Sequence, residues 1–214
     1  MTTSNKVLLF DLGNVLLPID LDLTYKAFAD YSTKYSFEEI KRMTHELALW
    51  MPYESGQQSD AEFRTFLRKE LSLHCTDQEF DKAFNALLLQ FPSEVYAFLQ
   101  TWKNQFAGLY LLSNTSNIHA IDYFQYTVGD EGVSIFPLFD QLFLSFEMGL
   151  VKPDSAIYQK VSDTINCPFD QIIFFDDNQF NIESARRLGL DAHLIQPNRS
   201  LKQINQTLRA YVNE

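Results

Sequence analysis

A short apolar run near the start of the chain constrains the fold more than any other feature. Residues 7–10 (Val-Leu-Leu-Phe) are too few for a helix, and Asp11 follows them directly. Such a run is typical of a strand buried on both faces inside a parallel sheet. Ligands of open α/β sheets bind beyond the carboxyl ends of the strands, so Asp11 lies where catalytic residues are usually found. The alternative is that Asp11 only caps a turn or helix.

Strand and helix patterns alternate in the second half of the chain. Further apolar runs lie at 109–112, 140–145, 171–175 and 192–195, and helical stretches follow at about 118–126, 154–165, 178–188 and 201–212. Alternating strands and helices imply crossover connections, and therefore a parallel sheet covered by helices on both faces. We predict an α/β fold with a Rossmann-like parallel sheet.

Residues 23–90 interrupt this alternation and contain no convincing strand. Four helices are expected there, at 23–34, 37–51, 59–71 and 77–89, and another runs from a cap at Ser93 to Phe106. Capping signals at Ser36, Ser59 and Thr76 support three of the four. Apolar residues three and four positions apart give each helix one buried face, which predicts an all-helical insert.

The composition excludes several classes of partner. The 214 residues carry a formal net charge of −11, whereas nucleic acids and anionic membranes both require a basic surface. No apolar run approaches the about 18 residues of a membrane span, and the polar start argues against a signal peptide. Cys75 and Cys167 lack the spacing of a disulfide framework or metal site, so we expect reduced thiols and a cytoplasmic protein.

Polar side chains follow three of the apolar runs, and a lysine follows the weaker one. They are Asp11, Ser113 with Asn114, Asp176 with Asp177, and Lys152. In a parallel sheet these groups would gather at one edge, where carboxylates from two strands can hold one Mg²⁺. A lysine and a hydroxyl can bind phosphate oxygens, while a free carboxylate oxygen of Asp11 attacks phosphorus. The constellation therefore suits phosphoryl transfer.

The order of these groups resembles the haloacid dehalogenase-like (HAD) hydrolase superfamily. The four motifs are FDLGNVL at 10–16, LLSNTS at 111–116, the lysine of GLVKPD at 149–154 and FFDDNQFNIESARRLG at 174–189. Together they cover the chain almost end to end. The first, second and fourth look like the branch that contains bacterial sugar-phosphate phosphatases of the α-glucose-1-phosphate type, which is related to the phosphatase domain of epoxide hydrolases.

The resemblance implies a domain organisation and an activity. The family carries a helical cap between its first and second motifs, so residues 1–19 and 91–214 are expected to form the core and residues 20–90 the cap. The implied activity is Mg²⁺-dependent hydrolysis of a small phosphorylated metabolite, with a sugar phosphate as the expected substrate, through an aspartyl-phosphate. The partner is then a small molecule, and the protein is expected to be a monomer or homodimer.

The resemblance also assigns roles to particular residues. Asp11 is expected to be the nucleophile, with Lys152 as the second catalytic residue. The expected phosphate ligands are Ser113, Asn114, Lys152 and Asn14. The expected Mg²⁺ ligands are Asp11, the carbonyl of Gly13, Asp177 and, directly or through water, Asp176.

One position departs from the pattern of the superfamily. Most of its phosphatases carry a second Asp two residues after the nucleophile, where it acts as general acid and base, and here that residue is Gly13. Loss of such a group typically costs about 10²–10⁴-fold in rate. The branch that the chain resembles shares the Gly-Asn pair, so activity is still expected. Water ordered by Asn14 or by a cap residue, or a leaving group at a sugar anomeric carbon, could compensate.

The cap is expected to choose the substrate. Trp50, Tyr53 and Glu54 precede a turn at Ser55–Gly56 and are candidates to face the active site. Aromatic residues beside a helix end more often only pack, and Glu54 could be a solvated charge. Asn117 and His119, just after the second motif, are further candidates for contact with a sugar.

Two other functions remain open at this point. Dehalogenases related to this fold also lack the second Asp and use no metal, and a non-catalytic phosphate-binding protein could retain the fold. The Asp176-Asp177 pair argues against a metal-free enzyme, because adjacent carboxylates repel each other unless a cation binds them. Turnover of p-nitrophenyl phosphate with and without Mg²⁺ separates a phosphatase from a non-catalytic phosphate-binding protein.

Overall fold

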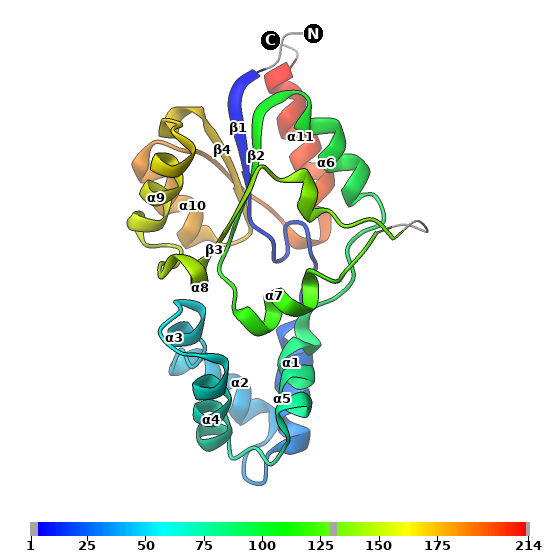
Figure 1. The fold of residues 1–214 in the computed structure, drawn as a ribbon, viewed down its shortest axis with the longest axis vertical. Helices are drawn as coiled ribbons and strands as arrows, with labels where there is room; N and C mark the ends of the chain where they lie inside the picture. The colour runs from blue at the N-terminus through cyan, green and yellow to red at the C-terminus, as the bar shows by residue number, and fades with distance from the viewer. Residues whose placement is uncertain (1–3, 129–131, 213–214) are drawn as a thin grey trace.

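Five parallel strands form the centre of the protein. The structure is a computed structural model and describes residues 4–128 and 132–212. The strands are β1 (Ser4–Phe10), β2 (Phe106–Ser113), β3 (Gln141–Leu144), β4 (Ile172–Asp176) and β5 (Asp191–Leu194). Their order in the sheet is β3-β2-β1-β4-β5, and every pair is parallel. The predicted Rossmann-like α/β core is confirmed, and β1 is its central strand (Figure 1).

Helices cover both faces of this sheet. Figure 1 shows α6 (Val95–Lys103) and α11 (Ser200–Val212) on one side, and α9 (Ser155–Ile165) and α10 (Gln179–Leu188) on the other. Leu8 and Phe10 of β1 pack in the cluster with α6 and α11, whereas Val7 and Leu9 pack in the cluster with α9 and α10. Successive strand residues point to opposite faces, so burial of both faces explains why the run is uniformly apolar. Shorter elements are α7 (Asn117–Tyr123), α8 (Ser145–Met148), η2 (Phe136–Leu138), η3 (Phe169–Gln171) and η4 (Pro197–Arg199).

An all-helical cap lies beyond the carboxyl ends of the strands (Figure 1). Its elements are α1 (Leu21–Tyr31), α2 (Phe37–Glu46), α3 (Met51–Glu54), α4 (Asp60–Leu71), α5 (Asp77–Phe84) and the 3₁₀ turn η1 (Asn85–Leu87). An aromatic cluster fills the centre, where Phe84 contacts both Phe28 and Phe63. The two connections to the core pair with each other, since Ile19 bridges Leu88. The exact division into residues 1–19 with 91–214 and residues 20–90 stays a prediction.

The cap helices differ from the predicted ones in one important place. Capping boxes at Ser36, Ser59 and Thr76 are present as predicted. The predicted helix over 37–51 is wrong beyond residue 46, because Ala48 has a φ of 46°, a left-handed conformation that a right-handed helix cannot include. The chain turns and starts α3, with a proline in its first turn. This break directs residues 51–54 towards the core.

The helix expected from Ser93 also starts later than predicted. Its N-cap is Glu94, which makes no capping bond with its side chain. The predicted helix over 77–89 gives way to the turn η1 after Phe84. These differences lie at helix ends, where local sequence signals are weakest.

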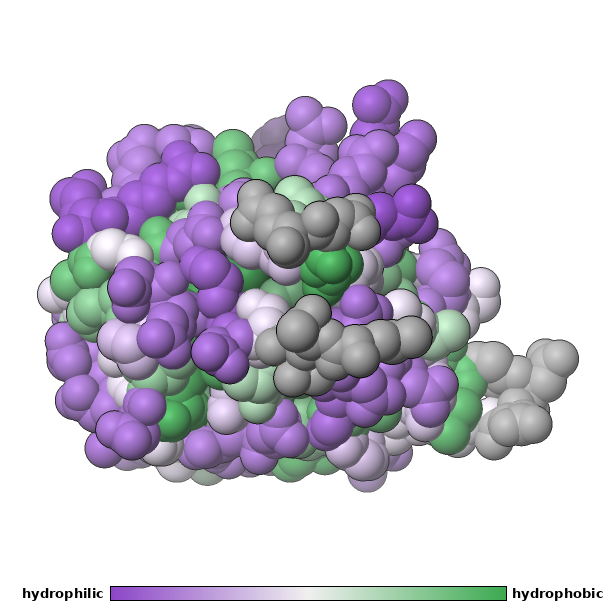
Figure 2. All heavy atoms as spheres, turned by 90° about the horizontal axis from the view of Figure 1, so that it is seen from above, coloured by the Kyte–Doolittle hydropathy of each residue, from purple (hydrophilic) through white to green (hydrophobic). Residues whose placement is uncertain are grey.

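The end of the core opposite the cap is mostly hydrophilic. Figure 2 shows it from above, with apolar side chains only scattered among polar ones on the visible surface. Within the described part of the chain, no helix is both long enough and apolar enough to cross a lipid bilayer.

Candidate active site

Asp11 lies immediately after β1, at the edge of the sheet that faces the cap. Its backbone N–H donates to the carbonyl oxygen of Phe175 at 2.9 Å and so extends the pairing of β1 with β4 by one residue. Ser113 ends β2 and Asp176 ends β4, on either side of β1. The sheet therefore brings together the strand-end residues that the sequence singled out.

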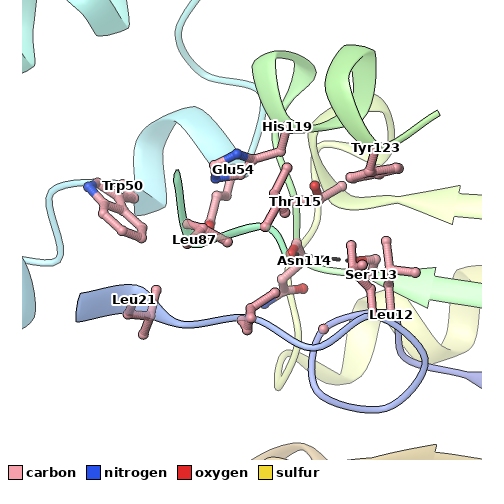
Figure 3. Close-up of a pocket in the computed structure, with 14 residues that line it drawn as sticks. Leu12, Leu21, Trp50, Glu54, Leu87, Ser113, Asn114, Thr115, His119 and Tyr123 are labelled. Carbon is pink, nitrogen blue, oxygen red and sulfur yellow. Dashed lines mark hydrogen bonds between the residues drawn. The ribbon is translucent and has the colours of Figure 1, made fainter. Parts of the chain in front are cut away.

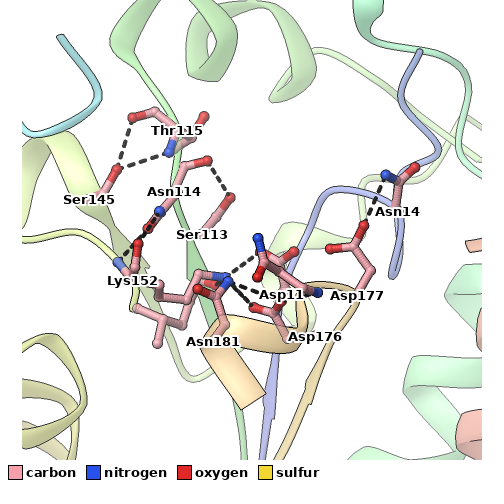
Figure 4. A network of polar contacts seen from close by, with 12 residues as sticks. Asp11, Asn14, Ser113, Asn114, Thr115, Ser145, Lys152, Asp176, Asp177 and Asn181 are labelled. Atoms are coloured by element: carbon pink, nitrogen blue, oxygen red, sulfur yellow. Dashed lines mark hydrogen bonds and ion pairs between the residues drawn. The ribbon is translucent and has the colours of Figure 1, made fainter. Parts of the chain in front are cut away.

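Lys152 joins these strand ends through its ammonium group (Figure 4). Its Nζ lies 2.8 Å from Oδ1 of Asp11, 2.7 Å from Oδ2 of Asp176 and 3.0 Å from the carbonyl oxygen of Leu112. The side chain is only 1% exposed. An ammonium has three hydrogens to donate, so all of them are used and the position of Nζ is fixed.

Asn114 holds the backbone of Lys152 in place. Its Oδ1 accepts from the N–H of Lys152 at 2.8 Å, and its Nδ2 donates to the carbonyl oxygen of the same residue at 2.9 Å. The predicted phosphate ligand thus already has partners for both ends of its amide. Among the described residues, the Ser113 hydroxyl makes only a 3.5 Å contact, with the carbonyl oxygen of Asn114, so it is available to a ligand. Phosphate binding by either residue stays a prediction.

Asn14 lies on the opposite side of the aspartates. Its Nδ2 donates to Oδ2 of Asp177 at 3.0 Å, and its Oδ1 accepts from the N–H of Ile19. The residue has a φ of 57°, which Asn adopts more readily than most residues. Asn14 therefore positions a predicted metal ligand, and its contact with phosphate stays a prediction.

Oxygen atoms of Asp11, Asp176 and Asp177 lie within 4.8 Å of one another. Both oxygens of Asp176 accept hydrogen bonds. Oδ2 accepts from Lys152 and Asn181, and Oδ1 accepts from Asn181 and from the N–H of Asn178. In the described part of the chain, no other residue donates a hydrogen bond to Oδ2 of Asp11 or Oδ1 of Asp177. Mg²⁺ prefers oxygen ligands and often takes only one or two carboxylates, so Oδ1 of Asp177 together with a carboxylate oxygen of Asp11 fits a magnesium ion.

The ionisation of the cluster also favours a bound cation. The pKa of Asp11 is raised to about 7, chiefly by burial, and the neighbouring carboxylates of Asp176 and Asp177 add to this rise. Lys152 acts in the opposite direction and lowers this pKa, but its effect is smaller than that of burial. Burial likewise raises the pKa of Asp177. Burial alone would lower the pKa of Lys152, but Asp11 and Asp176 raise it above its usual range, so the lysine stays charged. Three carboxylates thus face one ammonium, and a divalent cation would offset the excess negative charge.

Asn181 is a site residue that the sequence reasoning missed. Its Nδ2 lies 3.0 Å from each oxygen of Asp176, and its side chain is buried. It follows Asp177 by four residues in α10 and so faces back towards the strand end. That spacing within the fourth motif was the available signal.

A cavity of about 90 Å³ lies between core and cap, and Leu12 and Gly13, which directly follow Asp11, belong to its lining (Figure 3). Its walls come from the loop after β1, the end of β2, α7 and the cap; the lining residues are Leu12, Gly13, Leu17, Ile19, Leu21, Trp50, Glu54, Leu87, Leu88, Ser113, Asn114, Thr115, His119 and Tyr123. Of the three predicted cap contacts, Trp50 and Glu54 line it. Tyr53 does not, because its ring stacks on Phe63 at 4.1 Å inside the cap. His119 also lines the cavity.

Hydrogen bonds join the cap to the core around this cavity. The hydroxyl of Tyr53 accepts from the N–H of Ile118 at 3.1 Å and donates to Asp60 at 2.6 Å. Asn117 donates to the other oxygen of Asp60 at 2.9 Å. Asn117, a candidate for sugar contact, is thus engaged with the cap.

His119 is held as a neutral imidazole. Its ring stacks on Phe84 at 4.0 Å, and its Nδ1 lies 2.8 Å from Oδ1 of Asn85. Burial lowers the pKa of His119 to about 3. The amide of Asn85 also donates to the carbonyl oxygen of Ile118, which assigns its oxygen as the acceptor from Nδ1–H.

Comparison with known proteins agrees with this geometry. The family model described as haloacid dehalogenase-like hydrolase matches residues 5–189. The chain is 26% identical over 191 residues to a D-ribitol-5-phosphate phosphatase of Bacteroides thetaiotaomicron, covering 87% of this chain and 89% of that protein. It is 31% identical over 185 residues to a drimenol cyclase of Aspergillus calidoustus, covering 86% of this chain but only 33% of the cyclase. A HAD-family enzyme of Bacteroides thetaiotaomicron, solved with magnesium and inorganic phosphate, superposes with a TM-score of 0.79 at 26% identity, over 90% of this chain and 94% of that one.

Proposed function

Since the chain belongs to the haloacid dehalogenase-like hydrolase family, as its motifs predict, we propose that it is a Mg²⁺-dependent phosphatase of a small phosphorylated metabolite. One observation carries the proposal: Asp11, Asp176 and Asp177 converge around Lys152. The complex of a structural neighbour with magnesium and phosphate supports it.

The chain's own groups fit the two steps of phosphoryl transfer. Oδ2 of Asp11 attacks phosphorus, the bond to the leaving oxygen breaks, and an aspartyl-phosphate forms. Lys152 holds the other oxygen of Asp11 and balances charge on the phosphate, while the Ser113 hydroxyl donates to a phosphate oxygen. Water then attacks phosphorus, which releases Asp11 and inorganic phosphate.

The metal site would be built from the residues named above. Asp11, through its Oδ1, and Asp177 would bind Mg²⁺ directly, with the Gly13 carbonyl, which leaves Oδ2 of Asp11 for the attack. Asp176 would act through water because both its oxygens are occupied. When bound, Mg²⁺ would neutralise charge on the phosphate oxygens.

We propose a sugar or polyol phosphate as the substrate class. Glu54 and His119 line the cavity and offer hydrogen bonds to hydroxyl groups. The relative that acts on D-ribitol-5-phosphate supports this choice. A prenyl phosphate is the second candidate, because aliphatic side chains make up much of the wall, and the chain covers 89% of a sesquiterpene phosphatase of Aspergillus oryzae.

The alternatives fit the site less well. A metal-free dehalogenase would leave three carboxylates facing one lysine. A non-catalytic phosphate-binding protein would not need a carboxylate oxygen kept free of hydrogen bonds beside Lys152. A cytoplasmic location and a monomeric or homodimeric state complete the proposal.

Phosphate release from p-nitrophenyl phosphate and from a panel of sugar, polyol and prenyl phosphates tests the function. We expect turnover with Mg²⁺ that excess EDTA removes, and the highest kcat/KM on a hydroxylated ester. Turnover of a haloacid, or full activity in EDTA, would contradict the proposal. A preference for prenyl esters would move the substrate to the second class while the chemistry stands.

A further inference from the structure

We propose that Glu54, at the end of cap helix α3, is the general acid and base of the reaction, in the role of the aspartate that Gly13 replaces. This assignment rests on the proposed phosphatase activity. It follows from where Glu54 lies, how its backbone is held and which other groups line the cavity.

Glu54 and Gly13 line the same cavity, which also reaches the end of β2 (Figure 3). A Cβ at position 13 would lie 3.3 Å from Cδ1 of Ile19, so the position where other members carry an aspartate faces an aliphatic side chain here. Among the described residues that line the cavity, Glu54 is the one carboxylate. An acid for the leaving group therefore has to come from the cap.

The backbone that carries Glu54 is fixed to the core. Oγ of Ser145 lies 2.7 Å from the carbonyl oxygen of Glu54 and accepts from the N–H of Thr115 at 2.9 Å. Two residues on, Gly56 has a φ of +70°, and a Cβ there would come within 2.3 Å of the carbonyl oxygen of Phe146. Thr115 lies in the second motif, directly after Ser113 and Asn114, so the backbone of Glu54 is held beside the residues expected to bind the phosphate.

The side chain of Glu54 is free to serve the substrate. None of the side-chain hydrogen bonds in the described part of the chain involves its carboxylate, and it projects between Trp50 and Asn114 in Figure 3. Burial raises the pKa of Glu54 to about 7, near the value that suits a group acting first as acid and then as base.

The other titratable groups around it are neutral and do not compete for this role. Burial lowers the pKa of His119 to about 3, so the imidazole is neutral near pH 7. Its one N–H donates to Asn85 and is not available to a leaving group. Burial and the carboxylates of Asp22 and Glu54 raise the pKa of Tyr25, and burial raises that of Tyr123. Glu54 is thus the group that can change its charge in this cavity at neutral pH.

The proton balance of both steps is complete with Glu54. As Asp11 attacks, the bond between phosphorus and the leaving oxygen breaks, and that oxygen takes the proton of the Glu54 carboxyl group. The resulting carboxylate then takes a proton from water as the water oxygen attacks phosphorus. The bond from phosphorus to Asp11 breaks, and the enzyme returns to its starting state.

Leaving-group dependence tests this role, because a nitrophenolate leaves without a proton whereas an alkoxide needs one. The probes are p-nitrophenyl phosphate and 2-glycerol phosphate with Mg²⁺, and kcat/KM reports only the steps up to release of the alcohol. For Glu54→Gln we expect kcat/KM to fall by about 10²–10⁴-fold on the alkyl ester. On the nitrophenyl ester it should change by less than about tenfold, which also shows that the variant folds.

Glu147→Gln is the matched control, since Glu147 is exposed on the neighbouring helix α8. It should leave both rates unchanged. Equal losses on both esters in Glu54→Gln would reduce Glu54 to a structural residue, and an unchanged rate on the alkyl ester would overturn the assignment. If the wild-type protein hydrolysed neither ester, the proposed phosphatase would fall and this inference with it.

Discussion

The two sides of the cavity are built in opposite ways. On the core side, Asp11, Lys152 and Asp176 are buried and joined by hydrogen bonds of 3.0 Å or less. On the cap side, the wall is largely aliphatic, and the carboxylate of Glu54 has no hydrogen-bond partner in the described residues. Buried polar groups are normally hydrogen-bonded. This difference fits the proposed function, in which the core would supply the reaction centre and the Glu54 carboxylate of the cap would meet the substrate.

Removal of the nucleophile should cause the largest loss of activity, because it removes the reacting group on the core side of the cavity. Asp11→Asn keeps the shape of the side chain but cannot form the aspartyl-phosphate. We expect kcat to fall by at least about 10⁴-fold, as for the loss of catalytic nucleophiles elsewhere. Steady-state rates with Mg²⁺ measure this, and circular dichroism checks the fold. A folded variant with near wild-type turnover would show that another group attacks phosphorus.

Removal of the central lysine should affect both activity and stability. Lys152→Met leaves Asp11 and Asp176 buried without their ammonium partner. We expect turnover to fall by about 10²–10³-fold, and the free energy of unfolding in EDTA to fall by about 3–5 kcal/mol. Urea unfolding gives the second quantity. Lys160→Met, at an exposed position of α9, should change neither, and a stable Lys152→Met protein would contradict the tight core network.

A substitution on the cap side should have the smallest effect and should separate binding from chemistry. Trp50 lines the cavity, and Trp50→Phe makes that part of the wall smaller. We expect KM for the preferred phosphate ester to rise by up to about tenfold, because the bound ester loses apolar contact. The kcat for p-nitrophenyl phosphate should not fall. An unchanged KM on every ester would mean that Trp50 does not contact substrate.

The difference between the core and cap sides of the cavity also explains which site residues could be placed from the sequence. Strand ends in a parallel sheet must meet at one edge, so the strand-end aspartates and Lys152 could be placed from their order alone. The side chain of Asn114 could not, because its contact with the backbone of Lys152 depends on the path of a loop. In the cap, the outcome depended on the break at Ala48. A continuous helix over 37–51 would have placed Tyr53 and Glu54 differently, whereas α3 turns Tyr53 inwards and Glu54 into the cavity.

Calorimetric titration with MgCl₂ tests the central claim most directly, because it measures the metal site without any choice of substrate. Wild-type protein should bind one Mg²⁺, and Asp177→Ala should lose that binding. Asp30→Ala, which removes an exposed carboxylate of the cap, should bind like the wild type. Absence of binding in the wild type, or equal binding in Asp177→Ala, would contradict a magnesium-dependent phosphatase built on these aspartates.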